Sequence, residues 1–90
     1  MTTAKRDLIV PTVHLNGTSA ETLTDNLCEV YSAIGDAIRK LKQAAPNGRD
    51  YYLEPGSLER ATDQHMRRMK TLTDLQDELQ AEIEAIEDQS

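Results

Sequence analysis

Two regular apolar stripes, separated by a turn signal, constrain the fold of this chain more than any other feature. In the first stripe, apolar residues recur at alternating steps of four and three: Leu23, Leu27, Val30, Ile34, Ala37, Leu41 and Ala44. The second stripe consists of residues that lie seven apart: Leu58, His65, Leu72, Leu79 and Ile86. Met69 and Ile83 lie between them on the same face. This spacing is typical of amphipathic helices with a heptad-type face. Between the stripes stand Pro46, Asn47 and Gly48, residues that end helices and form turns.

The stripes and the turn predict an all-α fold in which two antiparallel helices form a hairpin. We expect a single helical-hairpin domain of residues 1–90, with helices over residues 19–45 and 57–88. The stretch TSAE, which begins at Thr18, has the pattern of a capping box. In this motif the threonine hydroxyl accepts a hydrogen bond from the backbone N–H three residues later, and the glutamate side chain bonds back to the cap. Ser57 is expected to cap the second helix.

Pairing the two stripes end to end gives an expected register. Leu41 should face Leu58, and Ile34 should lie near His65. Residues 8–17 are predicted to form a short extended segment, because they combine β-branched residues with a proline that cannot donate to a ladder.

The core of one such hairpin is expected to be thin, because the chain has 90 residues and only 3% aromatic residues. The single Cys28 excludes an intrachain disulfide, and its place among the apolar residues of the first helix predicts that it is buried. The end of the second helix carries Leu79, Ile83 and Ile86, which should pack on another subunit or on the extended segment. We therefore expect a homo-oligomer.

The charge distribution separates the chain into zones. The net charge of −6 argues against binding to duplex nucleic acid, which depends on lysine and arginine contacts to phosphates. Residues 39–70 nevertheless carry eight basic and four acidic groups, whereas residues 71–90 carry seven acidic groups and no basic one. The positive zone is either a solvated surface or a local anion site. No apolar run is long enough to span a membrane, and a lone cysteine fits a reducing compartment, so a cytoplasmic location is expected.

The stretch HLNGTS, which begins at His14, is the first candidate binding cluster. Asn16, Thr18 and Ser19 would offer hydrogen bonds beside the free backbone amides at a helix start, where an anion is favoured. A turn followed by a capping box explains Thr18 and Ser19 equally well, but it leaves His14 and Asn16 less well explained.

The stretch NGRDYY, which begins at Asn47, is the second candidate cluster. Arg49 is suited to bind a phosphate or carboxylate, and Tyr51 or Tyr52 to stack on a nucleobase. The alternative is structural: one tyrosine closes the end of the core, and Asp50 pairs with Arg49. A second tyrosine exceeds what that alternative requires.

Arg67 and Arg68 lie near His65 on the second helix. The simplest interpretation is that His65 is a core residue and that Arg67 forms an i,i+4 ion pair with Asp63. We predict that the chain is not an enzyme and needs no cofactor or metal, because the sequence shows no nucleotide-binding glycine motif, no triad pattern and no zinc-ligand spacing.

Over residues 12–70 the chain resembles a phage-encoded family, the anti-CBASS and anti-Thoeris sponge proteins built on a helical hairpin. The resemblance lies in a polar-aromatic N-terminal patch, in LKQAAPNGRD at the end of the first helix and in SLERATDQHM at the start of the second. It includes the motif P-x-G-R-[DE] at the turn. Those proteins are intracellular and commonly hexameric, and they sequester cyclic oligonucleotide or cyclic ADP-ribose-type signals without cleaving them.

The resemblance implies that this chain sequesters a cyclic nucleotide and that Arg67 or Arg68 adds charge to the pocket. It departs from the family where a stacking N-terminal tyrosine is replaced by the neighbourhood of His14, and where no phosphate-reaching lysine precedes Arg39. Two other hypotheses remain open: a small structural or assembly protein, and an inhibitor of a host protein that mimics nucleic acid with its acidic end.

Overall fold

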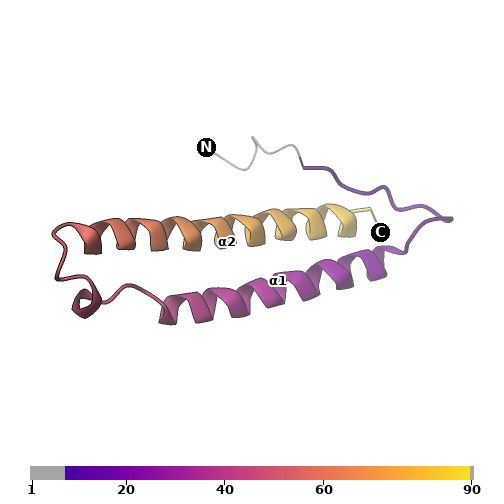
Figure 1. Ribbon diagram of the computed structural model, residues 1–90. Helices are drawn as coiled ribbons and strands as arrows, with labels where there is room; N and C mark the ends of the chain where they lie inside the picture. The colour runs from indigo at the N-terminus through magenta and orange to yellow at the C-terminus, as the bar shows by residue number, and fades with distance from the viewer. Residues whose placement is uncertain (1–7, 90) are drawn as a thin grey trace.

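The computed structural model describes residues 8–89, which form two long antiparallel helices joined by a folded connection (Figure 1). Helix α1 spans Ala20–Gln43, the short 3-10 helix η2 spans Gly48–Asp50, and helix α2 spans Ser57–Glu87. The molecule is elongated, with principal dimensions of 62 × 26 × 15 Å. The predicted all-helical hairpin is confirmed. No helix among the described residues is long and apolar enough to cross a bilayer.

The start of α1 corrects the predicted cap. Ser19, rather than Thr18, is the N-cap residue, and its Oγ accepts a hydrogen bond from the backbone N–H of Thr22 at 3.1 Å. Ser19 Oγ also donates to Thr22 Oγ1 at 3.0 Å. Because the helix begins at Ala20, only the residue directly before it can place its side chain against the free amides of the first turn.

The end of α1 and the start of α2 follow from local backbone chemistry. α1 stops at Gln43, two residues before the predicted end, because Pro46 disfavours helical geometry at the residue before it. α2 begins after Gly56, which has a φ of 79° that other residues rarely adopt. Ser57 is therefore the first helical residue and not the cap, and its hydroxyl donates to the carbonyl oxygen of Tyr51 instead.

The register of the two helices differs from the expected one. Gln76 Nε2 donates to the carbonyl oxygen of Tyr31 at 3.1 Å, whereas the expected register would place Tyr31 level with Arg68. The shift of about eight residues is about 12 Å along the helix. It arises because the connection itself covers the start of α2: a Cβ on Gly48 would stand 3.8 Å from the side chain of Leu58. Leu58 thus lies against the connection and not opposite Leu41.

The most deeply buried side chains lie at the open end of the hairpin, where α1 begins and α2 ends. Ile86 is 0% exposed and Ile83 is also buried. The N-terminal arm, residues 8–19, covers this end: Gln89 Oε1 accepts from Val13 N–H, and Gln89 Nε2 donates to Pro11 O, both at 2.9 Å. Of the two coverings expected for the end of α2, the arm is the one that the monomer provides.

Two details of the helices and the arm differ from expectation. Cys28 is exposed and not buried, because it directly follows Leu27 and is turned about 100° away from the inward stripe. Residues 8–17 contain no strand and run as irregular chain with a turn near Asn16, because the arm is held by the Gln89 side chain and not by a neighbouring strand.

Removal of the Ser19 hydroxyl is expected to destabilise the protein. Ser19→Ala should lower the free energy of unfolding by about 1 kcal/mol, because one amide of the first turn loses its acceptor. Urea denaturation followed by circular dichroism measures the change. Thr18→Ala is the matched control and should have almost no effect. An equal loss in both variants would contradict the assignment of the cap to Ser19.

Candidate ligand-binding site

The backbone of the NGRDYY stretch is fixed by its own hydrogen bonds. Asn47 Oδ1 accepts from Arg49 N–H at 2.9 Å, and Asn47 O accepts from Asp50 N–H at 2.9 Å. Tyr51 N–H donates to Gly48 O at 3.1 Å and completes the turn of η2. The connection is therefore a folded unit whose own hydrogen bonds hold the backbone that carries Arg49 and Asp50.

The two tyrosines of this stretch have different environments. Tyr51 is half-buried, and its carbonyl oxygen accepts a hydrogen bond from Ser57 Oγ at 2.9 Å, which ties the connection to α2. Tyr52 is 77% exposed. The sequence-based alternative of one structural tyrosine therefore fits Tyr51, and Tyr52 is the residue left free to contact a ligand.

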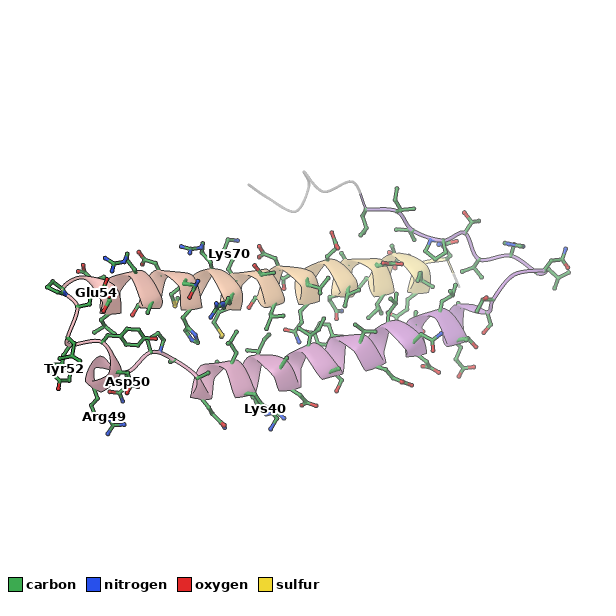
Figure 2. All side chains as sticks on the ribbon, viewed as in Figure 1. Lys40, Arg49, Asp50, Tyr52, Glu54 and Lys70 are labelled. Atoms are coloured by element: carbon green, nitrogen blue, oxygen red, sulfur yellow. The ribbon has the colours of Figure 1, made fainter. Side chains whose placement is uncertain are left out.

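Arg49 is exposed and lies near Tyr52 at the turn end of the hairpin, where η2 joins the two helices (Figure 2). Within residues 8–89, three ion pairs are present: Arg39 with Asp36, Arg60 with Glu54, and Lys70 with Asp74. The expected pairing of Asp50 with Arg49 is not among them, so the guanidinium of Arg49 takes part in no ion pair among the described residues.

Arg67 and Arg68 are exposed on α2, and the expected pair of Asp63 with Arg67 is also absent from the described residues. One chain does not bring them to Arg49. Leu58, which lies level with Gly48, precedes Arg67 by nine residues, or about 14 Å of helix. Any pocket that uses both Arg49 and Arg67 needs a large ligand or a second chain.

The HLNGTS cluster lies at the open end of the hairpin. His14 O accepts from Gly17 N–H at 3.1 Å, and the imidazole of His14 covers Gly17 so closely that a Cβ there would stand 2.7 Å from Nε2. His14, Asn16 and Thr18 are exposed, whereas the Ser19 hydroxyl is already engaged in capping α1. The structure brings these residues together at one turn.

The two clusters lie at opposite ends of a molecule 62 Å long (Figure 1). They do not form one site within a single chain. Each is an exposed surface and not an enclosed cavity.

Three further features bear on the chemistry of the molecule. His65 is buried in the seam, as expected of a core residue. An open depression on the first turns of α2, lined by Leu58, Glu59, Thr62 and Asp63, was not predicted; its two carboxylates make it unsuited to an anion. No group of three or more metal-ligating side chains lies within residues 8–89.

Antiparallel packing gives the hairpin a charge polarity that the linear sequence only suggests. The acidic start of α1 lies beside the acidic end of α2, so residues 20–35 and 71–89 together carry ten acidic groups and no basic one. Residues 36–70, which form the turn end, carry eight basic and five acidic groups. Arg49 and Tyr52 thus lie at the positive end.

Compared with known proteins, the chain matches no family model, no curated protein and no solved structure.

Proposed function

We propose that this chain is a binding protein that sequesters cyclic nucleotide second messengers, cyclic oligonucleotides or cyclic ADP-ribose-like signals, without cleaving them. The observation that carries the proposal is the pairing of an exposed Arg49 with an exposed Tyr52 on a backbone fixed by Asn47. A guanidinium binds phosphate with two donors, and a tyrosine ring stacks on a base. A ligand that carries both a phosphate and a base, as a cyclic nucleotide does, matches this surface best.

The remaining roles follow the resemblance to the phage sponge proteins. The chain would act in the host cytoplasm as a homo-oligomer, a hexamer in that family. Arg67 or Arg68 of a neighbouring subunit would add charge for the phosphates, and His14, Asn16 and Thr18 would contact a base or its sugar. Tyr51 and Ser19 support the two turns, given their structural contacts.

Titration calorimetry tests the proposal directly. The purified protein is titrated with a panel of cyclic dinucleotides, cyclic trinucleotides and cyclic ADP-ribose isomers, with the linear dinucleotides as controls. We expect heat with at least one cyclic member, binding that weakens as salt is raised, and recovery of the intact ligand after denaturation. Absence of heat across the panel would contradict the proposal.

A structural or assembly role is the second candidate, and exposed apolar side chains on the helices favour it. Val30, Met66 and Leu75 are all exposed, and apolar side chains that gather into one patch are typical of a surface that contacts another protein. This role predicts that Arg49→Ala leaves the biological activity intact, whereas the sequestering role predicts its loss. A phage-plating assay in cells that make such signals, with each variant expressed in trans, separates the two.

A further inference from the structure

Two apolar side chains in the middle parts of α1 and α2 are exposed. Val30 is 47% exposed and Leu75 is 40% exposed. The heptad spacing predicts Val30 on the inward stripe, but its exposure shows that it flanks the inward face of α1 instead. Val30 follows the half-buried Leu27 by three residues, and Leu75 follows the half-buried Leu72 by three, so each flanks the inward face of its own helix in the same way. In an antiparallel pair of helices, equivalent flanking positions lie on the same side of the seam. Each residue directly precedes one partner of the Gln76–Tyr31 hydrogen bond, so the two lie at nearly the same level of the hairpin and form one apolar patch across α1 and α2.

The charges on either side of this patch are of opposite sign. On the open-end side of the patch, residues 20–29 and 76–89 have a net charge of −9, and on the turn side, residues 31–74 have a net charge of +2. A second chain aligned in parallel on the patch would place acidic groups against acidic groups. A second chain rotated by half a turn would place each acidic end against a basic end.

We propose that a second copy of this chain docks antiparallel on the patch of Val30 and Leu75, with the turn end of each copy beside the open end of the other. A two-fold axis through the patch makes the interface self-complementary. The acidic open end of each copy then lies beside the basic turn end of the other. The central position of the patch along the 62 Å hairpin lets the two copies overlap over most of their length.

This pairing places the His14 cluster of one copy beside Arg49 and Tyr52 of the other. The two candidate clusters, which one chain holds at opposite ends, would then form a composite site that appears twice in the dimer. The composite site rests on the proposed function, whereas the pairing rests on the charges and the apolar patch alone.

Distances between spin labels test the pairing. Labels are attached to Leu53→Cys or Leu15→Cys in a Cys28→Ser background; both leucines are more than four-fifths exposed, at 83% and 98%. In the antiparallel pair, two Leu53→Cys labels should be separated by a distance comparable to the 62 Å length of the hairpin. A mixture of the Leu53→Cys and Leu15→Cys proteins should instead show a short distance. Short distances between Leu53→Cys labels, or a protein that stays monomeric, would overturn the pairing.

Subunit complementation tests the composite site. Arg49→Ala and His14→Ala should each weaken binding of the cyclic nucleotide found by calorimetry. Mixed and allowed to exchange subunits, the two variants should recover about a quarter of the wild-type sites, because half of the dimers are mixed and each contains one intact site. No recovery after exchange would overturn the composite site. If the wild-type protein binds no cyclic nucleotide, the proposed function fails, and the label distances still decide the pairing.

Discussion

Replacement of Ile86 by alanine is expected to destabilise this protein more than any other single truncation to alanine. Ile86 is the one fully buried side chain of the described residues, at 0% exposure. Truncation of such a residue costs about 2–5 kcal/mol, because apolar contacts are lost and a cavity is left. A domain of this size has a total stability of about 5–13 kcal/mol. Urea denaturation monitored by circular dichroism should therefore show a large fall in the midpoint.

The matched control is Ile9→Ala, which removes the same atoms from a side chain that is 83% exposed. It should change the free energy of unfolding by less than about 0.5 kcal/mol. Both variants should be measured at several protein concentrations, because subunit association adds to the apparent stability. Equal effects of the two substitutions would mean that the open end of the hairpin is not the core.

The helices could be predicted because their signals are local. A heptad-type stripe, a serine or threonine at a helix start and a proline after its end each act within a few residues. The predicted ends of both helices therefore agree with the observed ends to within two residues. The capping-box pattern indicates Thr18 and not Ser19 as the cap, because neighbouring hydroxyls are chemically equivalent until the first helical residue is known.

The register could not be predicted, because it depends on how much of α2 the connection covers. A register that pairs the two apolar stripes from the turn onward assumes that α1 packs against the start of α2. In the structure, η2 and Tyr51 of the connection lie against the first turns of α2, so α1 is displaced along the helix axis. Nothing in the stripes themselves specifies this offset, since heptad faces can pair in several registers. The clamp of Gln89 on Pro11 and Val13 joins residues more than seventy positions apart, and it has no local signal.

The composition of the candidate site could be read from the sequence, but the division of roles could not. Arg49 and a tyrosine pair stood out in a chain with three tyrosines and no other aromatic residue. Adjacent tyrosines point in different directions, and only the fold shows that Tyr51 is half-buried and Tyr52 exposed. The charge polarity also needed the fold, because it arises when distant acidic segments are packed side by side.

Substitution of Arg49 and Tyr52 is expected to abolish most ligand binding without loss of fold. Both side chains are exposed and Arg49 belongs to no ion pair among residues 8–89, so their removal leaves the core intact. Loss of a hydrogen bond to a charged group costs about 1.5–3 kcal/mol, so Arg49→Ala should weaken binding by about 10- to 150-fold. Loss of one stacked base costs about 1–3 kcal/mol, so Tyr52→Ala should weaken it by about 5- to 150-fold. Calorimetry with the best cyclic nucleotide measures both.

Matched substitutions assign these losses to the proposed contacts. Tyr52→Phe keeps the ring and should retain most of the affinity, whereas Arg49→Lys keeps the charge but loses the paired donors and should bind at an intermediate level. Arg39→Ala removes an exposed arginine that already pairs with Asp36, and it should leave binding almost unchanged. A steeper loss in Arg39→Ala than in Arg49→Ala would show that the ligand binds along α1, and the turn end would then not be the site. A loss in Tyr52→Phe equal to that in Tyr52→Ala would mean that the hydroxyl, and not stacking by the ring, makes the contact.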